Sequence, residues 1–207
     1  MIAPMFGAAI IGITRFLVGG HARWQGCAPE PRQRIYFANH SSHLDAVILW
    51  AALPGELRAA THPVAALDYW GKSRLHRFIA TRVLNAVLID RAPLGRNGRH
   101  DPLGPLTAAL DRGHSLILFP EGTRQNGAVP GPFKGGLHHL ARDYPGVELV
   151  PVYLSNLARA YPKGAILPAP IGCLVSFGAP LERVAEETKP FFLERARQAV
   201  CALGDAR

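Results

Sequence analysis

The chain has 207 residues, of which 48% are hydrophobic, and this length is enough for one sizeable core. Its 21 glycines and 18 prolines are scattered, which is ordinary for a globular protein with many turns and argues against a low-complexity chain. The net charge of +8 is compatible with nucleic acid, an anionic bilayer or a phosphorylated small substrate, and charge alone does not choose among these partners.

The first 30 residues are expected to contain a helix that lies in the membrane interface. No charged side chain precedes Arg15, and one helical face is apolar through Phe6, Ile10, Ile13 and Leu17. The uncharged run is shorter than the roughly 20 apolar residues that span a bilayer, and it lacks the preceding basic residue of a secretory signal. An ordinary core helix is the competing interpretation. We assign residues 1–30 to a membrane-associating helix and residues 31–207 to the main domain.

Strand-like and helix-like apolar segments alternate after residue 30. Strands are expected at 33–38, 63–67, 86–90 and 115–119, and near 148–154 and 172–177. Helices are expected at 42–53, 72–84 and 102–113, and near 134–143 and 189–203. This alternation predicts an α/β fold, a single layered domain with a largely parallel sheet flanked by helices. Ligands of such sheets bind beyond the strand ends, so polar residues that follow strands are the candidates.

The segment "ANHSSHLDAVILW" (38–50) places two histidines and an aspartate before an apolar run. Ser42 and Asp45 fit a capping box that starts a helix and needs no chemistry. A helix that begins at Ser42 also leaves His40 on the preceding turn, where it can fold back onto Asp45. Asp45 would then accept from one imidazole nitrogen and leave the other free as a base. We expect the segment to serve both roles.

Two other chemistries are less favoured for this segment. Neither Ser41 nor Ser42 stands in the G-x-S-x-G context of an activated nucleophile. His40, His43 and Asp45 could contact a metal, but the intervening residues supply no fourth ligand. We therefore expect neither a metal nor a serine nucleophile.

A carboxylate and a cation follow the expected strand at 115–119, in the sequence "PEGTR" (120–124). Gly122 permits a positive φ or a close approach of the backbone to a ligand. Arg124 offers a planar guanidinium suited to phosphate. The structural alternative is a surface turn in which Glu121 and Arg124 pair with their neighbours.

Two further cations are weaker candidates. Arg91 follows the expected strand at 86–90, where an ion pair with Asp90 is the structural alternative. Lys72 opens the basic segment 72–84, and a solvated lysine is common there. Together, the strand ends supply a base, its orienting carboxylate and cations for an anionic substrate. This set indicates base-assisted transfer onto a hydroxyl of a phosphorylated acceptor.

Four blocks stand in order along the chain: "NHSSHLD" (39–45), "LIDR" (88–91), "FPEGTR" (119–124) and "LVPVYL" (149–154, with Pro151). They resemble the blocks of the 1-acylglycerol-3-phosphate acyltransferase family, a family of glycerolipid acyltransferases. "PFKGGLHHLA" (132–141) is similar to the segment that this family carries between its last two blocks. The resemblance covers roughly residues 33 to 180, and four blocks in order are highly specific.

The resemblance implies transfer of a fatty acyl group from acyl-CoA or acyl-carrier protein to the free hydroxyl of a lysophospholipid. The most favoured acceptor is 1-acylglycerol-3-phosphate, which gives phosphatidic acid. His40 would deprotonate the hydroxyl while Asp45 holds the imidazole, and the oxygen would attack the thioester directly without a cofactor. The residues that the resemblance assigns to acceptor binding are Glu121, Gly122, Thr123, Arg124, Arg91 and Lys72.

Two departures from the family pattern leave the reaction class intact but open the identity of the acceptor. Gln125 stands where the family usually has serine, and "NAVL" (85–88) replaces a glycine and an aromatic residue. Another lysolipid, such as a lyso-ornithine lipid, is therefore an alternative acceptor. A hydrolase would need water in place of the lipid hydroxyl. A non-catalytic basic protein that binds anionic lipid is the alternative from another class.

The expected location is the cytoplasmic face of a membrane, with peripheral or monotopic attachment. The three cysteines are odd in number and far apart, which favours reduced thiols in the cytosol. We expect membrane lipids as partners but no nucleic acid, because the sequence carries neither a reader motif nor a stacking platform. The oligomeric state stays open.

Overall fold

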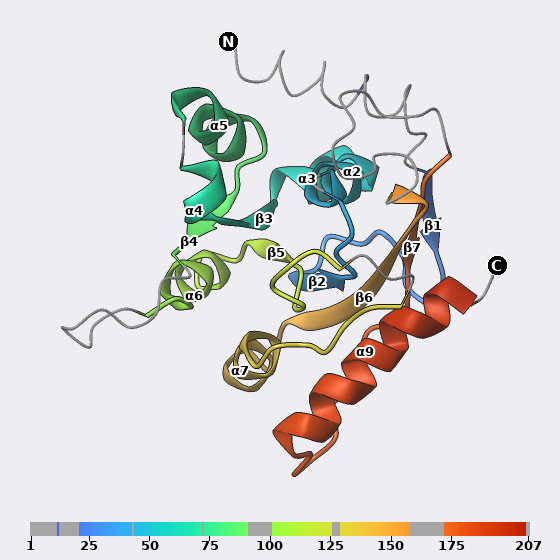
Figure 1. Ribbon diagram of the computed structural model, residues 1–207. Helices are drawn as coiled ribbons and strands as arrows, with labels where there is room; N and C mark the ends of the chain where they lie inside the picture. The colour runs from blue at the N-terminus through green and yellow to red at the C-terminus, as the bar shows by residue number, and fades with distance from the viewer. Residues whose placement is uncertain are drawn as a thin grey trace.

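A central β-sheet with helices on both faces forms the body of the computed structural model (Figure 1). The structure describes residues 12, 21–42, 44–71, 73–90, 101–125, 129–157 and 172–205. Within them, seven strands form one sheet in the order β1-β7-β6-β2-β5-β3-β4. This architecture confirms the predicted α/β fold with a largely parallel sheet.

The six strands and five helical segments expected from the sequence are present, with ends shifted by a few residues. The strands are β1 (His21–Trp24), β2 (Arg34–Ala38), β3 (Thr61–Ala66), β4 (Val87–Ile89), β5 (Ser115–Leu118), β6 (Glu148–Ser155) and β7 (Leu174–Phe177). The helices are α2 (Asp45–Ala52), α3 (Gly55–Ala59), α4 (Leu67–Trp70), α5 (Arg74–Phe78), the π-helical η1 (Ile79–Val83), α6 (Gly104–Leu110), α7 (Gly136–Asp143) and α9 (Lys189–Asp205). The sequence did not indicate β1, α3 or α4.

The strands from β6 to β4 run parallel, and this direction positions the candidate residues. β2 pairs in parallel with β5 and β6, and β3 pairs in parallel with β5 and β4. β7 runs antiparallel to β6 and parallel to β1. The carboxyl ends of β2 and β5 therefore meet at one edge of the sheet, and the segments that follow them lie side by side there.

Alternating side chains of β2 contribute to two separate cores. Tyr36 and Ala38 pack into the cluster that contains α2 and α3. Ile35 and Phe37 pack into the cluster that contains α6, α7 and α9. Burial on both faces explains why β2 and β5 read as continuous apolar runs instead of alternating ones.

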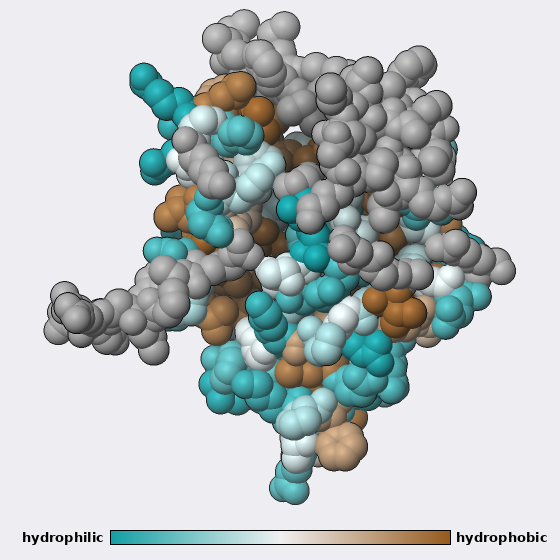
Figure 2. Space-filling model, viewed as in Figure 1, coloured by the Kyte–Doolittle hydropathy of each residue, from teal (hydrophilic) through white to brown (hydrophobic). Residues whose placement is uncertain are grey.

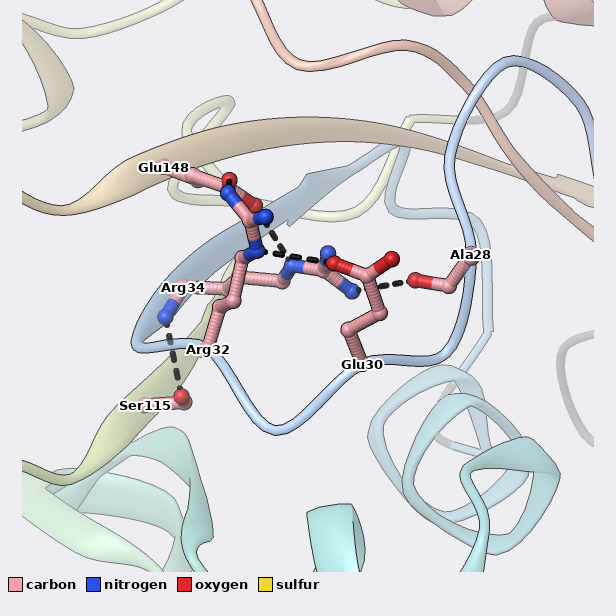
Figure 3. A network of polar contacts seen from close by, with 6 residues as sticks. All are labelled: Ala28, Glu30, Arg32, Arg34, Ser115 and Glu148. Carbon is pink, nitrogen blue, oxygen red and sulfur yellow. Dashed lines mark hydrogen bonds and ion pairs between the residues drawn. The ribbon is translucent and has the colours of Figure 1, made fainter.

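The amino end of β2 is fixed by a buried arginine (Figure 3). Arg34 is 2% exposed; its Nε lies 2.8 Å from Glu148 Oε2, and its Nη1 donates to the Ala28 carbonyl at 2.8 Å. Arg32 bonds the other oxygen of Glu148 at 3.0 Å. Because Arg34 and Glu148 stand opposite each other in the β2–β6 register, this pair ties two central strands together.

The expected N-terminal helix needs one correction. His21–Trp24 form β1, which pairs with β7, so this part of residues 1–30 belongs to the sheet. The strand is short and mostly exposed, so it carries no apolar run that would indicate it. The segment before it, apart from Gly12, lies outside the described residues, and the interface helix stays a prediction. Among the described residues, no helix is both long and apolar enough to cross a membrane.

Two other expected helices differ in detail. The helix expected at 42–53 is confirmed, but α2 begins at Asp45, after a turn in which Asp45 N donates to the Ser42 carbonyl. The basic helix expected at 72–84 is divided into α5 and η1, so its hydrogen-bond spacing changes at Ile79. A π-helical turn inside a helix is frequently found at functional sites.

Candidate active site

His40 and Asp45 meet, as the sequence analysis predicted. His40 lies between the end of β2 and the start of α2, and its Nδ1 is 2.8 Å from Asp45 Oδ2. The Asp45 carboxylate accepts, so the imidazole carries its hydrogen on Nδ1 and keeps Nε2 as an acceptor. His40 is therefore held in the tautomer that a general base requires.

Asp45 is completely buried and is held by the backbone of the same turn. Its Oδ2 also accepts from Ser41 N at 2.6 Å and Ser42 N at 2.8 Å. The bond from Ser42 N is one half of the predicted capping box. The other half does not form, because Ser42 Oγ accepts from Leu44 N at 3.3 Å and Leu44, not Ser42, is the N-cap residue of α2. Asp45 Oδ1 is buried and has no hydrogen-bond partner among the described residues, which is costly.

The backbone on both sides of His40 is fixed to neighbouring elements. Asn39 bonds both backbone groups of Leu154 in β6, accepting from its N at 2.7 Å and donating to its O at 3.1 Å. The His40 carbonyl accepts from Gln125 N at 2.9 Å, and the imidazole stacks on Phe119 with ring centroids 4.5 Å apart. The base is thus positioned from β5, β6 and its own turn.

Glu121 is a buried carboxylate in contact with the His40 turn. It is 2% exposed, and its two carboxylate oxygens accept from His40 N at 2.7 Å and Gly131 N at 2.9 Å. Burial raises the pKa of Glu121, although these backbone bonds and the His40 charge act in the opposite direction. One oxygen of Glu121 thus holds the His40 turn and the other holds Gly131, while its role in acceptor binding stays a prediction.

Gly122 has a φ of +71°, in the region that the sequence analysis anticipated. The Lys134 side chain lies across it: a Cβ at Gly122 would be 2.7 Å from Lys134 Nζ and 2.9 Å from Cε. The absence of a side chain at Gly122 therefore lets an ammonium group approach the turn that follows β5.

Two cavities meet at His40, Phe119 and Gly122. One, of about 370 Å³, has mostly aliphatic walls, and His40 and Lys134 are the only described residues in its lining with polar side chains. We call it the apolar cavity; its aliphatic walls are Val64, Ala66, Ile89, Leu103, Leu106, Leu118, Leu137 and Leu140. The other, of about 290 Å³, is the polar cavity, whose polar and aromatic lining includes Asp68, Tyr69, Trp70, Thr123 and Arg124.

Some of the predicted binding residues line these cavities, and others lie outside the residues that the structure describes. Thr123 and Arg124 line the polar cavity, and Gly122 lines both. Arg91 and Lys72 lie outside the described residues, as does His43 of the metal alternative. Across the described ranges, no cluster of three His, Cys, Asp or Glu side chains is arranged to hold a metal ion.

Three residues of this site do not stand out as candidates from sequence patterns alone. Phe119 belongs to the expected strand at 115–119, yet its ring supports the imidazole. Lys134 lies within the segment 132–141, and Asn39 is part of the first block. The apolar residue directly before "PEGTR" was a usable signal for Phe119, because a residue at a strand end faces the site.

The fold is that of a known lipid enzyme. The crystal structure of the 1-acyl-sn-glycerophosphate (LPA) acyltransferase PlsC from Thermotoga maritima matches with a TM-score of 0.71 at 20% identity, covering 98% of this chain and 78% of that chain. At this identity the likeness is evidence for the fold alone.

The family follows from the sequence match. Residues 25–155 match the family model described as Acyltransferase, and the chain belongs to that family. It is 27% identical over 183 residues to the 1-acyl-sn-glycerol-3-phosphate acyltransferase of Limnanthes alba, and 28% identical over 124 residues to that of Haemophilus influenzae. These matches cover 87% and 59% of this chain. The chain spans only 61% and 48% of the length of those relatives.

Proposed function

We propose that the protein is an O-acyltransferase that moves a fatty acyl group from a thioester to the free hydroxyl of 1-acylglycerol-3-phosphate, giving phosphatidic acid. The observation that carries this proposal is the His40–Asp45 pair at the junction of the two cavities. The relatives are 1-acyl-sn-glycerol-3-phosphate acyltransferases by name, which agrees with this acceptor.

His40 acts as the general base and then as the general acid. Nε2 takes the proton of the acceptor hydroxyl as the oxygen attacks the thioester carbonyl carbon. The tetrahedral intermediate then collapses, the C–S bond breaks, and Nε2 returns the proton to the leaving sulfur. Asp45 holds Nδ1 and stabilises the imidazolium during both steps. The proton and the leaving group are both accounted for, and we propose that His40 and Asp45 act without a cofactor or metal.

The two cavities supply separate places for the two substrates. The aliphatic walls of the apolar cavity suit the acyl chain of the donor, and the Lys134 ammonium stands at its boundary with the His40 turn. Arg124 in the polar cavity suits the acceptor phosphate. Both cavities open onto His40, so the hydroxyl and the thioester can meet there.

The acyl donor, acyl-CoA or acyl-carrier protein, is delivered to the apolar cavity, and the acceptor comes from a membrane. We propose peripheral or monotopic attachment at the cytoplasmic face, where both donors are made and the acceptor lipid is held.

Acyl transfer is tested by measuring free-thiol release with each donor and lysophosphatidic acid. His40→Ala should lower the rate on the order of 10⁴-fold, whereas His21→Ala, an exposed histidine of β1, should leave it unchanged. Far-UV circular dichroism and thermal melting confirm equal folding of the variants.

The acceptor is tested in the same assay with a panel of lysolipids. A rate that depends on a lyso-ornithine lipid but not on lysophosphatidic acid would replace the proposed acceptor. Thiol release without any acceptor would indicate a hydrolase, and no release with any donor and lysolipid would favour the lipid-binding protein. A rate that falls on addition of a metal chelator would contradict the cofactor-free mechanism.

A further inference from the structure

Two consecutive short helices, α4 and α5, bury none of their residues, although they contain leucine and aromatic side chains. The large hydrophobic residues exposed on the described surface are Leu67, Tyr69, Leu75, Val129, Val184 and Phe191. Half of them lie on α4 and α5, and Leu75 is 66% exposed. Figure 2 shows hydrophobic residues interleaved with hydrophilic ones over this part of the surface.

These helices are too short to be stable by themselves. Isolated helices of fewer than about 12 residues are marginal in water, and α5 spans Arg74–Phe78. Ser73 caps α5 by accepting from His76 N at 3.1 Å, and the rings of Tyr69, Trp70 and His76 contact one another. Local contacts thus hold the two helices in shape, while the side chains of Leu67 and Leu75 stay exposed on the described surface.

The charge of this surface points to the nature of its partner. Arg74 and Arg77 are exposed and stand three positions apart on α5, so they share a face. Arg82 follows on η1, and Asp68 is the only acidic residue between positions 67 and 84. Leucine and aromatic residues beside arginines are typical of surfaces that enter the interface of an anionic membrane.

This surface adjoins the polar cavity. Asp68, Tyr69 and Trp70 of α4 line that cavity, whose opposite wall carries Arg124 and His40. A lipid that enters from a membrane under α4 and α5 therefore reaches the base without crossing bulk water. A protein partner would not explain why the surface opens onto the substrate cavity. Nucleic acid is disfavoured because these rings contact one another edge to face and do not form a flat platform on which bases could stack.

We propose that α4 and α5 form a membrane-docking surface, on which Leu75 inserts into an anionic bilayer and Arg74 and Arg77 contact lipid phosphates. The surface delivers the acceptor to the polar cavity. This proposal rests on the proposed function for its acceptor lipid, but its test does not use activity.

The test is sedimentation of the full chain with vesicles of phosphatidylcholine alone or with 30 mol% phosphatidylglycerol, without donor or acceptor. The double variant Arg74→Gln/Arg77→Gln should bind the anionic vesicles roughly thirtyfold more weakly, at about fivefold for each arginine lost. The control Arg112→Gln/Arg142→Gln removes the same charge from exposed positions elsewhere and should bind as the unmodified chain. Leu75→Glu should weaken binding to both vesicle types by roughly tenfold, whereas Val184→Glu, at a residue that is 56% exposed, should not.

Unchanged vesicle binding by both the Arg74→Gln/Arg77→Gln and Leu75→Glu variants would overturn the proposal, since the N-terminal segment alone would then account for attachment. Equal losses in the two control variants would also overturn it, because binding would then depend on net charge. Loss of RNA binding without loss of vesicle binding would assign the surface to nucleic acid. An inactive chain that still passes the vesicle test would count against the proposed function and leave the docking surface intact.

Discussion

The two ends of strand β2 carry buried charges that are organised in opposite ways. At its start, the Arg34 guanidinium is matched by Glu148 and the Ala28 carbonyl. After its end, Asp45 has one oxygen with three donors and one oxygen with none, and His40 keeps a ring nitrogen for the cavities. At the start of β2 the charged groups have hydrogen-bond partners, and their contacts hold the sheet together. After its end, the second ring nitrogen of His40 stays available to a substrate in the cavities.

Two glutamates sharpen this contrast. Burial acts to raise the pKa of Glu148, but the bonds and charges of Arg34 and Arg32 outweigh it and hold the pKa below its ordinary value. Burial raises the pKa of Glu121 although its backbone N–H bonds and the His40 charge act to lower it, and the Asp45 charge adds to the rise. The two arginines outweigh burial at Glu148, whereas the amide bonds at Glu121 favour the charged carboxylate too weakly to do so.

Asp45→Asn should disrupt the site after the end of β2 and cause the largest loss of activity after that of His40→Ala. Oδ2 faces three donors, so the amide oxygen of asparagine must take its place, and the neutral amide no longer stabilises the imidazolium. We expect the thiol-release rate to fall on the order of 10³-fold, with the melting temperature little changed. A rate within a factor of ten of the unmodified chain would remove Asp45 from the mechanism.

Arg34→Ala should lower the stability of the protein by removing the ion pair at the start of β2. Removing Arg34 leaves Glu148 with Arg32 as its remaining cation and the Ala28 carbonyl without its donor. We expect this to cost about 2–3 kcal/mol of unfolding free energy, measured by urea denaturation. Activity per folded molecule should stay the same, because His40 lies at the opposite end of β2.

The double variant Arg34→Met/Glu148→Leu is the control for this change. It replaces the pair with apolar groups and should recover most of the lost stability. If the double variant is as unstable as Arg34→Ala, the loss comes from packing and not from an unpaired charge.

Glu121→Gln tests whether Glu121 positions His40 or binds the acceptor. An amide has one acceptor oxygen in place of two, so the bond to either His40 N or Gly131 N is lost. We expect kcat to fall about tenfold with KM for the acceptor unchanged, the cost of one buried hydrogen bond. A rise in KM at constant kcat would return Glu121 to the acceptor site.

The smallest expected effect is on the pH dependence of stability, to which Glu148 at the start of β2 and Glu121 beside His40 contribute with opposite signs. The lowered pKa of Glu148 contributes stability that is present above its ordinary value, 4.5, and lost as pH falls through its folded-state pKa. The raised pKa of Glu121 has the opposite sign: the folded state takes up its proton first, so stability is gained as pH falls from that pKa toward 4.5.

Urea denaturation between pH 3 and 7 measures both contributions. Glu148→Gln should flatten the loss of stability at acid pH, and Glu121→Gln should steepen it. Parallel curves for the two variants would contradict the opposite shifts.

The sequence predicted the catalytic pair better than it predicted the surrounding residues. The contact between His40 and Asp45 could be inferred from their spacing, because His40 lies in the turn after β2 and Asp45 begins the helix that follows it. Glu121 was assigned to the acceptor because its motif position carries no sign of burial. Its bonds to His40 and Gly131 come from segments far apart in the sequence, which pattern alone does not join.

Short and exposed elements were the ones that the sequence missed. β1, α3 and α4 span only four or five residues each, too few for a hydrophobic period to be read. Their structures depend on neighbours: β1 is completed by β7, and α4 contacts β3 and β4.

The sequence by itself determined the layered α/β fold, the positions of the main strands along the chain, and the base with its orienting carboxylate. Periodicity and local spacing encode these features. Only the tertiary structure decided which groups surround the base. Phe119, Glu121 and Lys134 reach His40 because parallel strands bring distant connections to one edge of the sheet. The tertiary structure also decided that Arg34 finds hydrogen-bond partners and that one oxygen of Asp45 does not. Hydrogen-bond partners depend on packing in three dimensions.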